Sequence, residues 1–129
     1  MPFTRLNPPG LPEPVAPYSM GTKAGNTIYV SGIVALDSAG KTVGVGDPRA
    51  QTRFVIQTIE KILHAGGASL RDVAFNTVLI KDMADYAAVN EAYREYFGEN
   101  PPARYCIAAT LVRNDLLVEI ASIAHIEAA

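Results

Sequence analysis

The C-terminal run from Leu117 to Ile126 constrains the fold more than any other part of the sequence. It is mostly apolar and is interrupted by the carboxylate of Glu119. This pattern predicts a strand that is buried on both faces of its sheet. Such a strand needs a covering layer on each side, so the rest of the chain must supply at least one of the two layers.

Two amphipathic helices are predicted, and their apolar faces supply one layer. The first begins with a capping Asp47 followed by Pro48, and it ends at Gly66. The second begins at Asp82 and Asp85 and ends at Gly98. Apolar or aromatic side chains recur on one face of each helix, at Val55, Ile59, Ile62 and Leu63 in the first and at Tyr86, Val89, Tyr93, Tyr96 and Phe97 in the second.

Other segments predict strands, a loop and a turn. The proline-dense segment 8–20 predicts an ordered surface loop, and Asn114-Asp115 between two apolar runs predicts a hairpin. Further strands are predicted at residues 27–31, 34–36, 73–80 and 105–112, with a kink at Gly32 between the first two. Since two helices cover only one face of the resulting sheet, the other face most simply meets another copy of the chain.

Composition limits the class of protein. With 129 residues, the chain is long enough for one domain with a single core, spanning 1–129. The net charge of −2 and the lack of a basic stripe argue against a nucleic-acid partner. No apolar run approaches the roughly 18 residues that span a bilayer, so no membrane association is expected. A single cysteine and the absence of a secretory signal predict a cytoplasmic protein.

Two familiar kinds of site are not supported by the sequence. Residues 35–42 match a permissive phosphate-loop pattern, but the glycines and proline that follow exclude the helix which that motif requires. The two histidines, His64 and His125, lie in different elements at no ligand spacing from each other or from Cys106. We therefore expect neither a metal ion nor a cofactor.

Arg104 and Glu119 are stronger candidates for functional residues than the histidines are. A carboxylate inside an apolar run is costly if it is buried unpaired, so Glu119 needs either a partner or a function. Alternation along the strand puts Arg104 and Cys106 on one face. A structural Glu–Arg pair at the rim of the sheet is one interpretation, and a site for an acidic small molecule is the other. Asn90, at the border of an apolar stripe, also needs a hydrogen-bond partner.

The predicted hairpin adds a geometric expectation. With Asn114-Asp115 at its tip, Glu119 pairs with Thr110, on the same sheet face as Cys106 and about 13 Å from it at ~3.3 Å per residue. That distance is too large for one small-molecule site. The alternative is that Glu119 of one subunit serves a pocket that contains Arg104 of another. Cys106 itself is either a nucleophile or a small buried hydrophobe, and the sequence leaves both interpretations open.

The chain resembles the reactive-intermediate deaminase family, also called RidA/YjgF. Five matching segments follow one another in the family's order over nearly the whole chain, namely Ala16-Pro17-Tyr18, Val30-Ser31-Gly32, Val89–Tyr93, Pro102–Cys106 and Val118–Ala121. Three further segments resemble the RutC branch, which acts on 3-aminoacrylate in pyrimidine degradation; they are Asp47–Arg53, Phe75-Asn76 and Leu117–Ile126.

This resemblance implies a fold and an assembly. The fold is α+β and chorismate-mutase-like, with a mixed sheet that carries two helices on one face. The assembly is a homotrimer in which three sheets form a central β-barrel and the active sites lie in clefts between subunits. The family hydrolyses enamine or imine carboxylates, releases ammonia and leaves a carbonyl acid. No metal or cofactor is implied.

The resemblance also implies roles for individual residues. Arg104 clamps the substrate carboxylate, and Glu119 orients or deprotonates water or carries a proton to the departing ammonia. Tyr18 and Gly32 line the cleft, Asn90 helps to order it, and the backbone amide of Cys106 contacts the carboxylate. We therefore predict an aminoacrylate deaminase that acts on 3-aminoacrylate. The alternatives are a broad 2-iminoacid or 2-aminoacrylate deaminase and a non-catalytic small-molecule-binding trimer; the presence of both Arg104 and Glu119 favours the enzymes.

Overall fold

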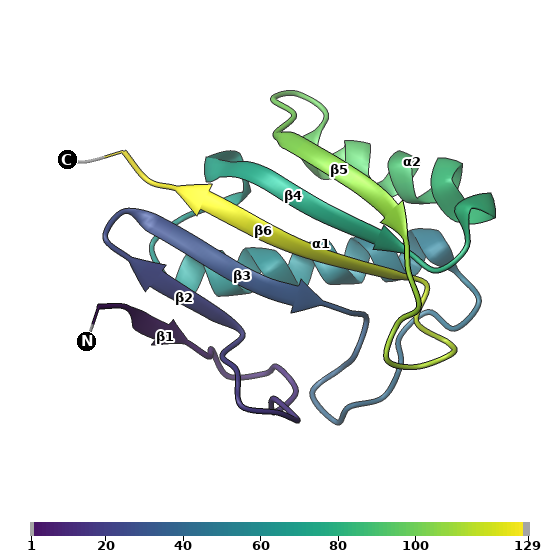
Figure 1. Cartoon of the computed structure of the whole chain (residues 1–129), viewed down its shortest axis with the longest axis horizontal. Helices are drawn as coiled ribbons and strands as arrows, with labels where there is room; N and C mark the ends of the chain where they lie inside the picture. The colour runs from purple at the N-terminus through teal and green to yellow at the C-terminus, as the bar shows by residue number, and fades with distance from the viewer. Residues whose placement is uncertain (1, 128–129) are drawn as a thin grey trace.

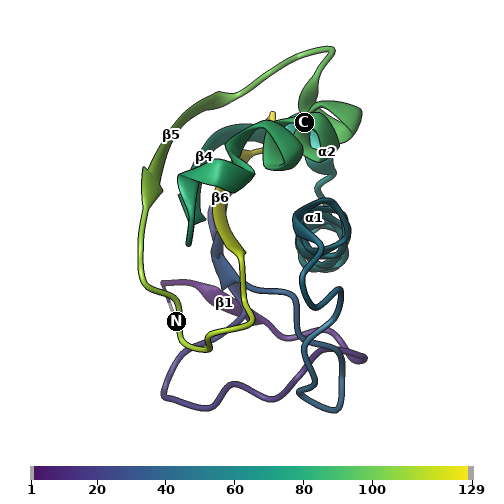
Figure 2. The same ribbon diagram turned by 90° about the vertical axis from the view of Figure 1, so that its right-hand side faces the viewer.

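The computed structural model describes residues 2–127, which form one six-stranded mixed sheet with both long helices on one face (Figures 1 and 2). This is the α+β arrangement predicted from the sequence. The strands are β1 (Thr4–Leu6), β2 (Gly21–Ala24), β3 (Thr27–Ile33), β4 (Val73–Ile80), β5 (Ala103–Ala108) and β6 (Val118–His125). The helices are α1 (Pro48–Ala65) and α2 (Tyr86–Phe97), with single 3₁₀ turns at Leu70–Asp72 and Met83–Asp85. Neither long helix combines the length and hydropathy of a membrane span.

The strand order β1-β2-β3-β6-β4-β5 places β6 in the middle of the sheet, as its apolar sequence requires. All neighbouring strands are antiparallel except β4 and β5, which are parallel and are joined through α2. A parallel pair needs a crossover of this kind, because its connection must return to the starting edge of the sheet.

The predicted hairpin around Asn114-Asp115 is wrong. The strand expected at 105–112 runs only from Ala103 to Ala108 and pairs with β4, so β4 separates it from β6. Residues 109–117 connect β5 to β6 around the end of β4, and the Asn-Asp turn lies within this connection. The Asn114-Asp115 pattern predicts only a local turn. Which strands pair with one another depends instead on which of them bury both faces in the sheet.

Helix α1 begins and ends where the sequence predicts. The Asp47 carboxylate accepts a hydrogen bond from the backbone amide of Ala50 at 3.0 Å, and Pro48 occupies the first turn, where no hydrogen-bond donor is needed. Of the two residues predicted to start helix α2, Asp82 caps the preceding 3₁₀ turn, and Asp85 directly precedes the α-helix, which starts at Tyr86. Both helices pack their apolar faces on the sheet.

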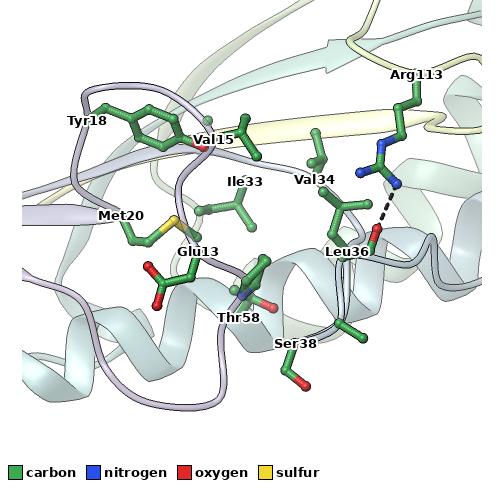
Figure 3. A pocket seen from close by; sticks show the side chains of 14 residues that line it. Glu13, Val15, Tyr18, Met20, Ile33, Val34, Leu36, Ser38, Thr58 and Arg113 are labelled. Carbon is green, nitrogen blue, oxygen red and sulfur yellow. Dashed lines mark hydrogen bonds between the residues drawn. The ribbon is translucent and has the colours of Figure 1, made fainter.

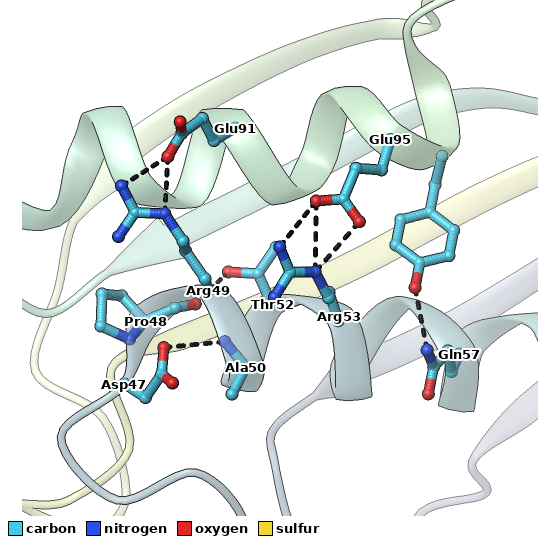
Figure 4. Close-up of polar contacts among 10 residues, drawn as sticks. Asp47, Pro48, Arg49, Ala50, Thr52, Arg53, Gln57, Glu91 and Glu95 are labelled. Carbon is cyan, nitrogen blue, oxygen red and sulfur yellow. Dashed lines mark hydrogen bonds and ion pairs between the residues drawn. The ribbon is translucent and has the colours of Figure 1, made fainter.

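Polar contacts on the exposed side join α1 to α2 (Figure 4). Two ion pairs and one hydrogen bond are spaced about one helical turn apart, namely Arg49–Glu91, Arg53–Glu95 at 2.8 Å, and Gln57–Tyr96 at 2.8 Å. Each exposed pair contributes little stability alone. Together they join the exposed sides of the two helices, while Asn90 on another face of α2 contacts Arg104 of β5.

Among residues 2–127, no helix covers the sheet face opposite α1 and α2 (Figure 2). Four large side chains on this face are exposed, namely Tyr29 (48%), Tyr105 (51%), Ile107 (49%) and Ile123 (38%). Strand pairing puts Tyr29 beside Ile123, and the ring of Phe75 contacts that of Tyr105 at 5.8 Å between centres. Contiguous apolar surface of this kind is typical of an interface.

Two short strands were not predicted. β1 and β2 extend the sheet at the edge beyond β3, and the proline-dense segment 8–20 connects them without regular structure, as expected. The extended structure predicted at 34–36 is reduced to a single bridge between Leu36 and Thr42.

Candidate active site

Arg104 lies near the start of β5, and its side chain points toward α2. Its Nη2 atom donates hydrogen bonds to Oδ1 of Asn90 at 2.7 Å and to the hydroxyl of Tyr86 at 3.4 Å. Its guanidinium carbon is 4.7 Å from the centre of the Tyr93 ring. The hydrogen bond and the aromatic face together hold the planar guanidinium in one orientation.

A groove of about 400 Å³ adjoins this guanidinium, between α2 and the segment that leads into β5. The Arg104 Nη1 atom is buried, and no atom of residues 2–127 accepts a hydrogen bond from it. A buried donor on a cation is costly to leave unpaired, and an anion is its best partner. The arrangement is therefore suited to receive a carboxylate beside Nη1.

Cys106 follows Arg104 on the same face of β5 and packs against the core. Burial raises the pKa of its thiol, and the nearby charge of Arg104 lowers it by less. A thiol with a raised pKa is mostly protonated at neutral pH and is a poor nucleophile. Of the two interpretations left open by the sequence, the structure favours packing over nucleophilic catalysis.

The backbone N–H group of Cys106 points away from β4, toward the open edge of the sheet. The amide of Ala109 donates to the carbonyl of Ile80 on β4 at 3.0 Å. Successive amides along a strand point in opposite directions, so those of Ile107 and Tyr105 also face β4. The amide of Cys106 therefore faces the open edge, two residues from the clamp at Arg104, where it is available to a ligand.

Glu119 lies on β6 with its side chain on the face opposite the helices. Strand pairing places Glu119 beside Leu79, and Leu79 beside Ile107, in one row across that face. The side chain is half-buried, and burial raises the pKa of its carboxyl group. A neutral carboxylic acid is therefore more populated near neutral pH than it is for an ordinary glutamate.

Gly32 makes room for the Glu119 carboxyl group. A β-carbon at this position would overlap Oε2 of Glu119 and would lie 3.0 Å from its Cδ. The requirement here is space rather than an unusual backbone angle, because the φ angle of Gly32 is not positive. Any side chain at position 32 would displace the carboxyl group from its present place.

Tyr18 and Gly32 share a second cavity of about 320 Å³, which lies between the proline-dense loop and the end of β3 (Figure 3). Its walls are mostly apolar. Arg113 closes one side, where its Nη1 atom donates to the carbonyl of Gly40 at 2.7 Å. Figure 3 shows Tyr18 and Glu13 on the loop side of the cavity, away from Arg113.

The structure thus divides the predicted site residues into two groups. Arg104, Asn90 and Cys106 lie together beside α2, while Gly32 meets Glu119 and shares a cavity with Tyr18. The expectation that Glu119 shares a sheet face with Cys106 is wrong, because it rested on the hairpin register. Within one chain, Arg104 and Glu119 are on opposite faces of the sheet and form no ion pair.

The contacts of Tyr86 and Tyr93 with Arg104 were not predicted from the sequence. Both were assigned to the apolar stripe of the second helix, yet both of their rings lie against the guanidinium of Arg104. A signal was present, because Tyr86, Asn90 and Tyr93 recur at helical spacing on one face. It was not specific, since the same spacing describes an ordinary core-facing helix.

Replacing Glu119 with glutamine should raise stability at neutral pH. Because burial raises the folded-state pKa of this carboxyl group, the folded protein resists its ionisation more than the unfolded chain does. The cost is absent below the ordinary value of 4.5, grows as pH rises toward the raised pKa, and is complete above it. We expect the free energy of unfolding in urea to be higher for Glu119→Gln than for the wild type at pH 8, and equal at pH 4.

Glu95→Gln is the control of opposite sign. The hydrogen bond from Arg53 lowers the pKa of Glu95, so its contribution to stability is present at neutral pH and is lost on acidification. When all proteins are measured at the same concentration, Glu95→Gln should therefore be less stable than the wild type at pH 8. A Glu119→Gln protein that is destabilised at pH 8 would show that the carboxylate is ionised and paired in the assembled protein.

Comparison with known proteins gives a family match and relatives of the same length. Residues 10–126 match the family model described as endoribonuclease L-PSP. A relative named 3-aminoacrylate deaminase RutC, from Acinetobacter baylyi, is 52% identical over 126 residues, which cover 98% of this chain and 100% of the relative.

Solved structures show the same fold. A protein of Thermotoga maritima is 34% identical with a TM-score of 0.90, covering 97% of this chain and 98% of the other. RidA from the Antarctic bacterium Psychrobacter sp. is 31% identical with a TM-score of 0.87, covering 95% and 99%. These matches confirm the fold expected from the resemblance to RidA/YjgF and, with the RutC relative, the resemblance itself.

Proposed function

Since the chain belongs to the family described as endoribonuclease L-PSP, we propose that it is a hydrolytic deaminase of small enamine and imine carboxylates, with 3-aminoacrylate as its substrate. The 52% identity to a relative named for that activity, over the whole relative, supports the choice of substrate. We assign the reaction to pyrimidine degradation, as the source of such a substrate, and to the cytoplasm, where the free thiol of Cys106 stays reduced.

The buried Arg104 Nη1 atom without a protein acceptor carries this proposal. Asn90 holds Nη2 of the same guanidinium, and Tyr93 supports its face, so the donor is fixed before any ligand arrives. A carboxylate bound at Nη1 would also reach the outward amide of Cys106. A charged carboxylate at this position satisfies a donor that is otherwise buried and unpaired.

The reaction needs water and proton transfer. 3-Aminoacrylate, H₂N–CH=CH–COO⁻, takes a proton at the carbon next to the carboxylate and becomes an iminium ion. Water adds to the carbon that carries nitrogen, one proton leaves that water, and the nitrogen receives a proton. The hydroxyl group then loses its proton as the C–N bond breaks, so ammonia and 3-oxopropanoate are formed from one enamine and one water. Placement and proton handling are the main requirements for the protein.

Glu119 is the group that handles protons. Because burial raises the pKa of its carboxyl group, the neutral acid is available to protonate the enamine carbon or the departing nitrogen. The resulting carboxylate then accepts a proton from the attacking water. One residue can therefore serve both steps, provided that it lies near the reacting carbons while Arg104 holds the carboxylate.

A shared site meets this condition. Within one chain, Arg104 and Glu119 lie on opposite faces of the sheet, so no small substrate reaches both. β5 is an edge strand, and the face that carries Glu119 is apolar and uncovered. We therefore assign Arg104, Asn90 and Cys106 to one subunit and Tyr18, Gly32 and Glu119 to its neighbour. Catalysis then requires assembly.

The open sheet face supports a closed assembly. Its exposed tyrosines and isoleucines need a partner surface of the same kind, and identical chains arranged around an axis provide one. We propose a homotrimer in which three such faces meet as a central β-barrel. Each of its three interfaces would join the Arg104 edge of one subunit to the Glu119 face of the next.

Release of ammonia from freshly generated 3-aminoacrylate tests the function. The protein should accelerate release over the spontaneous rate, and the acceleration should saturate with substrate. The 2-aminoacrylate isomer, tested in parallel, separates this proposal from a broad 2-iminoacid deaminase, which would favour that isomer. If neither isomer is consumed faster with the protein present, the alternative of a non-catalytic binding trimer replaces the enzyme.

A further inference from the structure

Three polar side chains form a row on the helix-covered face of the sheet, and only one of them belongs to the proposed site. Asn76 on β4 lies beside Arg104 on β5, and Ser122 on β6 lies beside Asn76. Asn76 is 0% exposed and Ser122 is 2% exposed. Their neighbours on the same face are apolar, so this row is a polar inclusion within the core.

Hydrogen bonds connect the row to α2. The Ser122 hydroxyl donates to Oδ1 of Asn76 at 2.5 Å, and Nδ2 of Asn76 donates to the hydroxyl of Tyr93 at 2.9 Å. The serine determines which way the amide faces, because it takes the oxygen side and leaves the NH₂ group toward α2. The Tyr93 ring, held in this way from the core, lies under the guanidinium of Arg104.

Stability alone gives little reason for this network. Burial of an amide and two hydroxyls costs free energy, and a satisfied network mainly offsets that cost. Apolar side chains of similar volume would pack the same space at least as well. What the network adds is a defined position for one tyrosine ring.

We propose that Asn76, Ser122 and the Tyr93 hydroxyl are positioning residues, which fix the Tyr93 ring so that the Arg104 guanidinium lies on it with Nη1 directed at the substrate carboxylate. The inference rests on the proposed role of Arg104 as the carboxylate clamp. None of the three polar groups touches the substrate in this scheme. They affect the affinity for the substrate carboxylate by fixing the orientation of the Arg104 guanidinium.

Tyr93→Phe tests the proposal because it keeps the ring and removes only the hydroxyl. We expect the Kd for propionate, an unreactive three-carbon carboxylate, to rise roughly three- to tenfold, about the value of one net hydrogen bond. KM for 3-aminoacrylate should rise by a similar factor, and kcat should change less. Tyr96→Phe is the matched control, since it removes a tyrosine hydroxyl of α2 that bonds to Gln57 and not to the clamp.

A triple variant separates positioning from structure. Tyr93→Phe combined with Asn76→Leu and Ser122→Ala removes every member of the network, so no polar group is left buried and unpaired. We expect stability to recover relative to Tyr93→Phe while the weak propionate binding persists. If affinity recovers together with stability, or if Tyr93→Phe binds propionate as tightly as Tyr96→Phe does, the network is only structural and the inference is wrong.

Measurement of the Kd for propionate also separates this inference from the proposed function. Wild-type protein should bind propionate, and Arg104→Lys should bind it more weakly. If Arg104→Lys binds as the wild type does, the clamp itself is wrong. If binding depends on Arg104 but not on the Tyr93 hydroxyl, the proposed function stands and only the positioning network falls.

Discussion

Arg104→Lys is expected to lower kcat/KM for 3-aminoacrylate by roughly 10- to 100-fold while the protein stays folded. Lysine keeps the positive charge but loses the planar fork, so it cannot contact Asn90 and a carboxylate in the same fixed geometry. Loss of one hydrogen bond to a charged group costs about 1.5–3 kcal/mol, which corresponds to this range of rates. Ammonia release from freshly generated substrate measures the effect.

Arg94→Lys is the matched control for this variant. Arg94 borders the same groove, but the hydrogen bond to the Asn90 side chain and the contact with the Tyr93 ring are made by Arg104 and not by the Arg94 side chain. The same conservative change there should leave kcat/KM within about twofold of the wild type. Circular dichroism and the oligomeric state should be unchanged in both variants. Near-normal turnover by folded Arg104→Lys would show that a point charge suffices and would remove the clamp from the mechanism.

Much of the fold follows from local sequence signals. The Asp47 cap and the apolar stripe of α1 act within a few residues of one another, so they can be identified without knowledge of the rest of the chain. The same holds for β4 and β6, whose apolar runs are long enough to stand out. β1 and β2 escaped prediction because each is only a few residues long, and pairing with distant residues decides their state.

The hairpin error shows where local signals fail. An Asn-Asp turn between two apolar runs is compatible with a hairpin, and it is equally compatible with a longer connection. A second signal favoured the observed topology, because β4, α2 and β5 form a strand–helix–strand unit, which usually places its two strands in parallel. That signal acts over a longer stretch of sequence, and it predicts that β5 lies parallel to β4 and does not form a hairpin with β6.

The candidate site could be predicted as a set of residues but not as a geometry. Arg104 and Glu119 stood out because charged groups in apolar strands need an explanation. Their placement on opposite faces depends on the register of three strands, which no single segment encodes. The contacts of Arg104 with Tyr93 follow from the crossover topology, because that topology brings α2 against the edge strand.

Mixing two inactive variants is expected to restore about one quarter of the wild-type activity. Arg104→Ala chains lack the clamp and Glu119→Gln chains lack the proton carrier, so each alone should be nearly inactive. In a random one-to-one mixture, half of the interfaces receive an intact Arg104 edge, and half of those also receive an intact Glu119 face. A site within a single chain would give no recovery, because every chain carries one defect.

The double variant, Arg104→Ala with Glu119→Gln, makes the same test from the opposite direction. Mixed one-to-one with wild-type chains, it should leave about one quarter of the activity if the site is shared and about one half if each chain has its own site. The chains are unfolded together in urea and refolded, and native mass spectrometry measures how completely they have mixed. Activity near one half in fully mixed oligomers, with no recovery in the first mixture, would place both residues in one subunit. Such a result would contradict their positions on opposite faces of the sheet, since no small substrate bridges those faces within one chain.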